Sequence, residues 1–228
     1  MSLYITVFLA CFIAALVLFG LNMFLESQKF KETGTERYNF LKFFPYELNM
    51  FHRLNKVSFI HLILPVLGSL CLLGSMVFFG LGVIKQGGAV TAAFILVGAH
   101  ALFLIAFNLL RFIKLTNYRN HLIFSSITVG SLLLIAILSA FFFFNGEISF
   151  FRNNHLAIRI IASGISILII VFEFILLFNK SYKDWAKLVK VEAENFSRPK
   201  HCYLAIVEWG SALAYLITYI PLILMMIL

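Results

Sequence analysis

Two glutamates stand inside apolar stretches of membrane-spanning length, and they are the residues best suited to chemistry. Glu208 begins a stripe of polar side chains spaced by three, four and four residues, which places them on one face of a helix. This stripe consists of Glu208, Ser211, Tyr215 and Tyr219. A second stripe contains Arg159, Ser163, Ser166 and Glu173. We expect both stripes to face inward or toward a partner, with leucine and isoleucine facing lipid.

The two glutamates are predicted to lie at one depth, in the third of the membrane nearest the cytoplasm. Each stands about five residues from the same end of its apolar stretch, at about 1.5 Å per residue. An ionised carboxylate there costs up to about 3 kcal/mol, so we expect them to approach each other. Burial and a neighbouring carboxylate favour the protonated form, which makes either glutamate a predicted proton carrier. Alternatively, Glu208 reaches Lys200 and the headgroups. Glu173 would then reach Lys180 or a histidine.

Further polar residues complete this layer. Asn108 lies near the end of one apolar stretch and His61 near the start of another, whereas His100 lies near mid-membrane among small residues. A haem held by two histidines is not indicated, because His61 lies about 10 Å nearer the cytoplasm than His100. A buried neutral His100, bonded to a serine or a backbone carbonyl, is the alternative. The predicted substrate or proton pathway comprises Glu173, Glu208, His100, Asn108, His61 and Tyr215. The other histidines, predicted at the interfaces, are His52, His121, His155 and His201.

The composition is that of a polytopic membrane protein. The chain is 62% hydrophobic and 12% charged, with a mean hydropathy of +0.99. Its apolar runs are continuous rather than alternating, which predicts an all-α integral membrane protein and not a β-barrel. The six predicted helices of this single domain, residues 1–228, cover about 3–25, 57–84, 89–110, 122–144, 156–178 and 203–228.

The basic residues predict the topology. Of the eighteen Lys and Arg, six lie in residues 26–56, three in 111–121 and six in 179–201. The positive-inside rule places these three loops in the cytoplasm and both termini outside. The net charge of +8 is therefore a topology signal and does not predict nucleic-acid binding. The abundance of Phe and Ile favours a bacterial cell membrane.

The three cytoplasmic loops are entered and left in similar ways, which suggests three tandem helical hairpins. An asparagine precedes each loop, at Asn22, Asn108 and Asn179. Each returning helix begins with a histidine and then carries a Gly-Ser pair, at Gly68-Ser69, Gly130-Ser131 and Gly210-Ser211. Small residues at such positions let membrane helices approach closely. The alternative is that Asn and His merely favour the interface.

The first cytoplasmic loop alternates aromatic and charged residues, and Pro45 interrupts it. We predict that it lies in the headgroup region, where its basic residues meet anionic lipid. The alternative is that it docks a cytoplasmic protein partner. The residues predicted to form this partner or lipid surface are Phe43, Phe44 and Tyr46, with Trp185 in the last cytoplasmic loop.

The sequence carries no signature of a soluble enzyme, such as a phosphate-binding loop or a nucleophile elbow. The isolated cysteines Cys11, Cys71 and Cys202 predict neither a disulfide framework nor a metal site, and no cofactor is indicated. The favoured hypothesis is a small transporter or transporter subunit. The alternative is a non-catalytic membrane subunit that anchors a cytoplasmic partner. A third is an intramembrane enzyme acting on a lipid or a quinone.

Overall fold

The computed structural model describes residues 3–33, 38–48, 59–85, 89–113, 117–145, 156–178 and 201–227. Within these ranges the chain is helical apart from short turns and connections. The helices are α1 (Leu3–Thr33), α2 (Pro45–Leu48), α3 (Phe59–Lys85), α4 (Val90–Leu110), α5 (Tyr118–Asn145), α6 (Leu156–Phe178), α8 (Tyr203–Ile217) and α9 (Tyr219–Ile227).

Six apolar spans confirm the predicted fold class. Helices α1, α3, α4, α5 and α6 each supply one span, and α8 with α9 supplies the sixth, from Tyr203 to Met226. Only a helix satisfies every backbone N–H and C=O within a single segment in lipid, which is why continuous apolar runs fold this way. Large apolar side chains such as Phe94 and Leu168 are exposed on the outside of the bundle. The chain is a multi-pass membrane protein.

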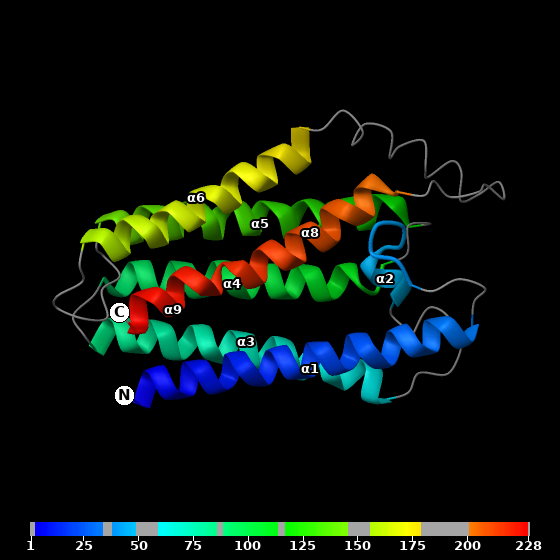
Figure 1. The fold of residues 1–228 in the computed structure, drawn as a ribbon, viewed down its shortest axis with the longest axis horizontal. Coiled ribbons are helices and arrows are strands. Elements are labelled where there is room, and N and C mark those ends of the chain that lie inside the picture. Colours follow the sequence, from blue (N-terminus) through cyan, green and yellow to red (C-terminus); the bar gives the residue numbers. More distant parts are fainter. Residues whose placement is uncertain are drawn as a thin grey trace.

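Successive spans run in opposite directions along the bundle (Figure 1), so both ends of the described chain lie at the same end of it. Helix α1 packs against α3, α4 against α5, and α6 against α8 and α9. This is the pairing that three successive hairpins predict. Helices α3 with α4 and α5 with α6 join the hairpins into one layer, over which α8 and α9 pass.

The last span carries much of the core. Tyr215 and Tyr219 are fully buried, and the Tyr215 ring stacks on Phe103 of α4 with 3.9 Å between ring centroids. The span divides at Thr218, whose hydroxyl donates to the Tyr215 carbonyl at 2.6 Å. Pro221 explains this division, because proline lacks the N–H that would continue the helical hydrogen bonds.

The first helix is longer than predicted, continuing to Thr33 instead of ending near residue 25. Pro45 was expected to break a helix, but it is instead the first residue of the short helix α2. Proline suits this position because its missing N–H would have no helical partner there. The Phe44 N–H is satisfied by the Glu47 carboxylate at 2.8 Å, which caps the helix.

The three Gly-Ser pairs do not behave alike. A Cβ added at Gly68 would lie 3.0 Å from the Phe19 ring, and one at Gly210 would lie 3.1 Å from Leu176, so these helices approach closely. Gly130 has no such neighbour within 4 Å and faces outward. The predicted close approach of a neighbouring helix is wrong at Gly130, because Gly130 lies on the outer face of α5 and the adjacent Ser131 lies on the buried face.

This difference supplies a stability test. Gly210→Leu should force α8 away from α6 and lower the free energy of unfolding by about 1–3 kcal/mol. Gly130→Leu is the matched control and should melt like the parent, because its side chain enters open space. Thermal unfolding in detergent measures both variants. Equal melting temperatures for the two variants would contradict the packing described.

Candidate functional site

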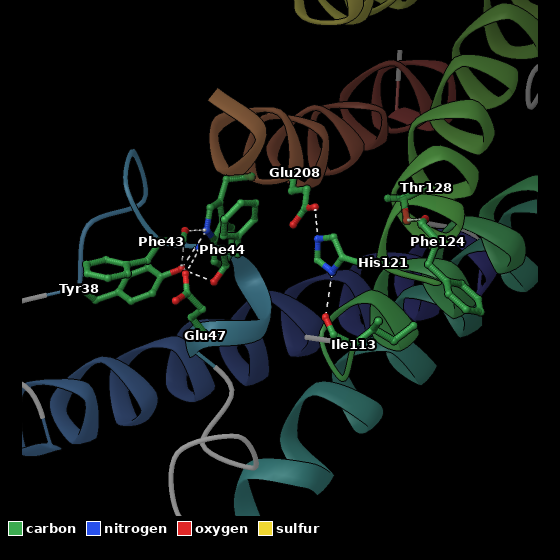
Figure 2. Close-up of polar contacts among 10 residues, drawn as sticks. Tyr38, Phe43, Phe44, Glu47, Ile113, His121, Phe124, Thr128 and Glu208 are labelled. Atoms are coloured by element: carbon green, nitrogen blue, oxygen red, sulfur yellow. Dashed lines mark hydrogen bonds and ion pairs between the residues drawn. The ribbon is translucent and has the colours of Figure 1, made fainter. Parts of the chain in front are cut away.

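A buried pair of titratable side chains joins the start of α5 to α8 (Figure 2). His121 Nε2 lies 2.8 Å from Glu208 Oε1, and both side chains are at most 1% exposed. His121 Nδ1 lies 2.8 Å from the Ile113 carbonyl oxygen. Glu208 therefore does not reach the headgroups. His121, predicted at the membrane interface, lies near the start of its span, and its ring points into the bundle.

This contact requires a proton between the two side chains. The Ile113 carbonyl can only accept, so His121 Nδ1 must carry a hydrogen. Nε2 then either accepts from a protonated Glu208 or, as part of an imidazolium, donates to a carboxylate. Both arrangements are neutral overall and share one proton. Without it, two lone pairs would face each other at 2.8 Å. The second oxygen, Glu208 Oε2, is buried without a hydrogen-bond partner among the described residues.

Residues 38–48, which we call the cover segment, lie over this pair (Figure 2). The Phe44 and Tyr46 rings meet His121 nearly at right angles, with centroids 5.8 and 5.5 Å away. Both rings are buried, so they do not contribute to the predicted partner or lipid surface. They face inward because they cover a polar pair that would otherwise meet water. Phe43 is half-buried, and Trp185 lies outside the described residues.

Polar contacts attach the cover segment to α8. Trp209 Nε1 donates to Tyr38 Oη at 2.9 Å and to the Phe43 carbonyl at 3.1 Å. The Cys202 N–H donates to the Leu41 carbonyl at 2.6 Å. The Tyr38 hydroxyl donates within the segment, to the Phe44 carbonyl at 2.9 Å. Burial raises the pKa of Tyr38 far above its ordinary value, so this hydroxyl remains a donor.

The second glutamate, Glu173 of α6, contacts α8 one turn beyond Glu208. Ser211 donates to Glu173 Oε2 at 3.1 Å, and Glu173 is fully buried with Oε1 lacking a partner in the described part of the chain. The two predicted polar stripes meet at this one contact, because Arg159 and Ser163 of the second stripe donate to carbonyls of α5 and Ser166 donates within α6. Because Ser211 follows Glu208 by three residues, the two glutamates lie at neighbouring levels along α8, Glu208 bonded to His121 of α5 and Glu173 bonded to Ser211.

A directed chain of hydrogen bonds lies deeper in the membrane. The Tyr219 hydroxyl donates to the Leu72 carbonyl at 3.2 Å, which uses its only hydrogen. Tyr215 must then donate to Tyr219 across 3.3 Å, and His100 Nδ1 must donate to Tyr215 across 3.2 Å. His100 is therefore the Nδ1–H tautomer. Its Nε2 is a buried acceptor with no partner among the residues described.

Asn108 acts in helix packing rather than in this network. Its side-chain amide donates to Ser69 Oγ at 2.7 Å and to the Leu104 carbonyl at 2.8 Å, which ties α4 to α3. It is half-buried, and the contacts of its side chain are separate from those of His100, Glu173 and Glu208. His61 belongs to α3, but its side chain lies outside what the structure describes.

A buried ion pair was missed by the sequence analysis. Arg111 Nη2 lies 3.1 and 3.3 Å from the two Glu26 oxygens, and both residues are buried. The pair joins α1 to the end of α4. Both residues were predicted to lie in cytoplasmic loops, because each is a charged residue just beyond the end of an apolar run. Glu26 follows Asn22 by one helical turn, and this spacing was the available signal that α1 continues.

Comparisons of the chain with protein-family models, with curated proteins and with solved structures find no match. The fold and the site alone therefore define the class. It is a six-span helical membrane protein with a covered, proton-sharing histidine and glutamate at one end of its bundle.

Proposed function

We propose that the chain is a small proton-linked transporter, or the membrane subunit of one, in which His121 and Glu208 take up and release the proton. The supporting observation is their buried 2.8 Å contact, which requires a shared proton. The buried ion pair of Arg111 and Glu26 is a different kind of contact from the one between His121 and Glu208. Arg111 engages both Glu26 oxygens through a guanidinium group, which is charged at every physiological pH, whereas histidine is the side chain whose charge ordinarily changes near neutral pH.

The polar face of α8 and α9 supports a route inward from this pair. Ser211 with Glu173, and then Tyr215 with His100, follow Glu208 at successive turns. Three buried atoms along the route lack partners among the described residues, namely Glu208 Oε2, Glu173 Oε1 and His100 Nε2. Ionisable residues in membrane spans usually mark ion or substrate pathways. Unpartnered acceptors are suited to a transient water, proton or substrate donor.

The charge distribution supports an orientation for this transporter. We place the end of the bundle that carries the cover segment in the cytoplasm, because the predicted basic loops belong to that end. Both termini are then outside the cell, and the membrane is a bacterial cell membrane. The partner-anchoring alternative is less well supported, because Phe44 and Tyr46 are occupied inside the protein.

Proton binding can be tested without knowing the substrate. Proteoliposomes on a solid-supported membrane should give a transient current after an acid jump, because protons enter a buried site. Glu208→Gln should abolish most of this charge displacement. His201→Gln is the matched control, since His201 is exposed near the same end of α8. Undiminished currents in Glu208→Gln would contradict the proposal.

A further inference from the structure

The His121–Glu208 pair is sealed at its end of the bundle by the cover segment. His121 and Glu208 are almost inaccessible to solvent, and the Phe44 and Tyr46 rings contact the imidazole from the segment's side. Cys202 packs in the same cluster and is only 1% exposed. A proton or hydrated substrate arriving from this side therefore requires the segment to move.

The segment is built to move as one piece. Its internal bonds hold its shape: Tyr38 donates to the Phe44 carbonyl, Glu47 accepts from the Phe44 N–H, and Asn39 accepts from the Leu41 N–H. Its polar attachments to α8 are different bonds, donated by Cys202 and Trp209. Breaking the attachments does not require breaking the internal bonds. The Phe30 ring of α1 packs edge-on against Tyr38 and gives the segment a second support.

We propose that the cover segment is a proton-controlled gate, closed while His121 and Glu208 share their proton and released when they lose it. This rests on the proposed function, in which that pair is the proton site. Loss of the proton leaves a buried carboxylate facing an imidazole lone pair, and such a charge requires water or a counterion. Lifting the Phe44 and Tyr46 rings admits water.

The other ionisable groups described around the pair have hydrogen-bond or ion-pair partners outside it. Arg111 is neutralised by Glu26, and the buried Tyr38 hydroxyl stays protonated. Glu47 of the segment holds the Phe44 N–H. From α6, Glu173 bonds to Ser211 rather than to the pair. The thiol of Cys202, which forms no disulfide, lies in the cluster under the segment and serves as a reporter.

The test measures how fast a membrane-impermeant maleimide labels Cys202 in nanodiscs, with Cys11 and Cys71 replaced by alanine. Each labelling rate of the parent is divided by the labelling rate of Glu208→Gln at the same pH. This ratio cancels the rise of the maleimide reaction with pH, which occurs because the reagent reacts with the thiolate. The glutamine amide can donate to His121 Nε2 at every pH, so this variant should stay closed. We expect the ratio of the parent rate to the Glu208→Gln rate to be near one at about pH 5 and about ten or more at about pH 9.

A second variant separates the gate from general loosening. Tyr38→Phe removes one of the two acceptors of Trp209 Nε1 and also the internal bond to the Phe44 carbonyl, so the segment is held less tightly whatever the state of the pair. Labelling at low pH should therefore rise even with Glu208→Gln present. Ratios near one at both pH values would overturn the gate. If acid-jump currents still depended on Glu208 in that case, the proton site would stand and only the gate would fail. Currents independent of Glu208 would instead overturn the proposed function.

Discussion

Replacing Arg111 by alanine is expected to lower the free energy of unfolding by about 3–5 kcal/mol, because it leaves Glu26 buried without its counterion. Glu26 is fully buried, and Arg111 lies 3.1 Å from its carboxylate. The bond joins α1 to the end of α4, so its loss should also loosen the first hairpin against the second. Thermal unfolding in detergent measures the effect.

Two further variants separate the charge from the packing. The double variant Glu26→Gln with Arg111→Met should recover much of the loss, because it removes both charges while keeping similar volumes. Arg119→Ala is the matched control, since Arg119 is exposed close by in the chain. If Arg111→Ala melts at the parent's temperature, the ion pair does not hold α1 in place.

His121→Leu should cost about 3 kcal/mol of unfolding free energy, since it leaves Glu208 buried with no partner. Glu208→Gln should cost less than about 1 kcal/mol, because its amide can donate to His121 Nε2 in place of the shared proton. The difference arises because the leucine leaves both Glu208 and the Ile113 carbonyl without their imidazole partner, whereas the glutamine keeps a donor to His121. Equal melting temperatures for His121→Leu and the parent would show that the pair is not a buried contact.

Much of the fold could be predicted because lipid imposes a simple rule on the sequence. Continuous apolar runs located the six spans, and the three-to-four spacing around Glu208 placed Ser211 and Tyr215 on the buried face. The end of α1 was misplaced because Glu26 and the basic residues after it ended the apolar run, although helix formation in water needs no such run. Hydropathy predicts where a span leaves the membrane, but it does not predict where the helix ends, which for α1 is at Thr33.

The partners of the site residues could not be predicted, because spacing along one helix carries no information about its register against another. His121 and Glu208 are 87 positions apart, and nothing within α5 or α8 alone aligns them. Glu208 was therefore expected to approach Glu173, which was predicted at the same depth. The inward direction of Phe44 and Tyr46 was missed for a related reason. An aromatic loop near a membrane has the same composition whether it lies on lipid or covers a polar site.

The shared proton itself is the most direct test of this account. Nitrogen-15 NMR of the imidazole rings, with His121 assigned by difference from His121→Gln among the six histidines, reports which ring nitrogens carry hydrogen. We predict that at about pH 6 His121 has hydrogen at Nδ1 and a shared proton at Nε2. Only the Nδ1–H form should remain once the pair is deprotonated, and Glu208→Gln should show the Nδ1–H form throughout. A His121 spectrum that is identical in the parent and in Glu208→Gln at every pH would contradict the account.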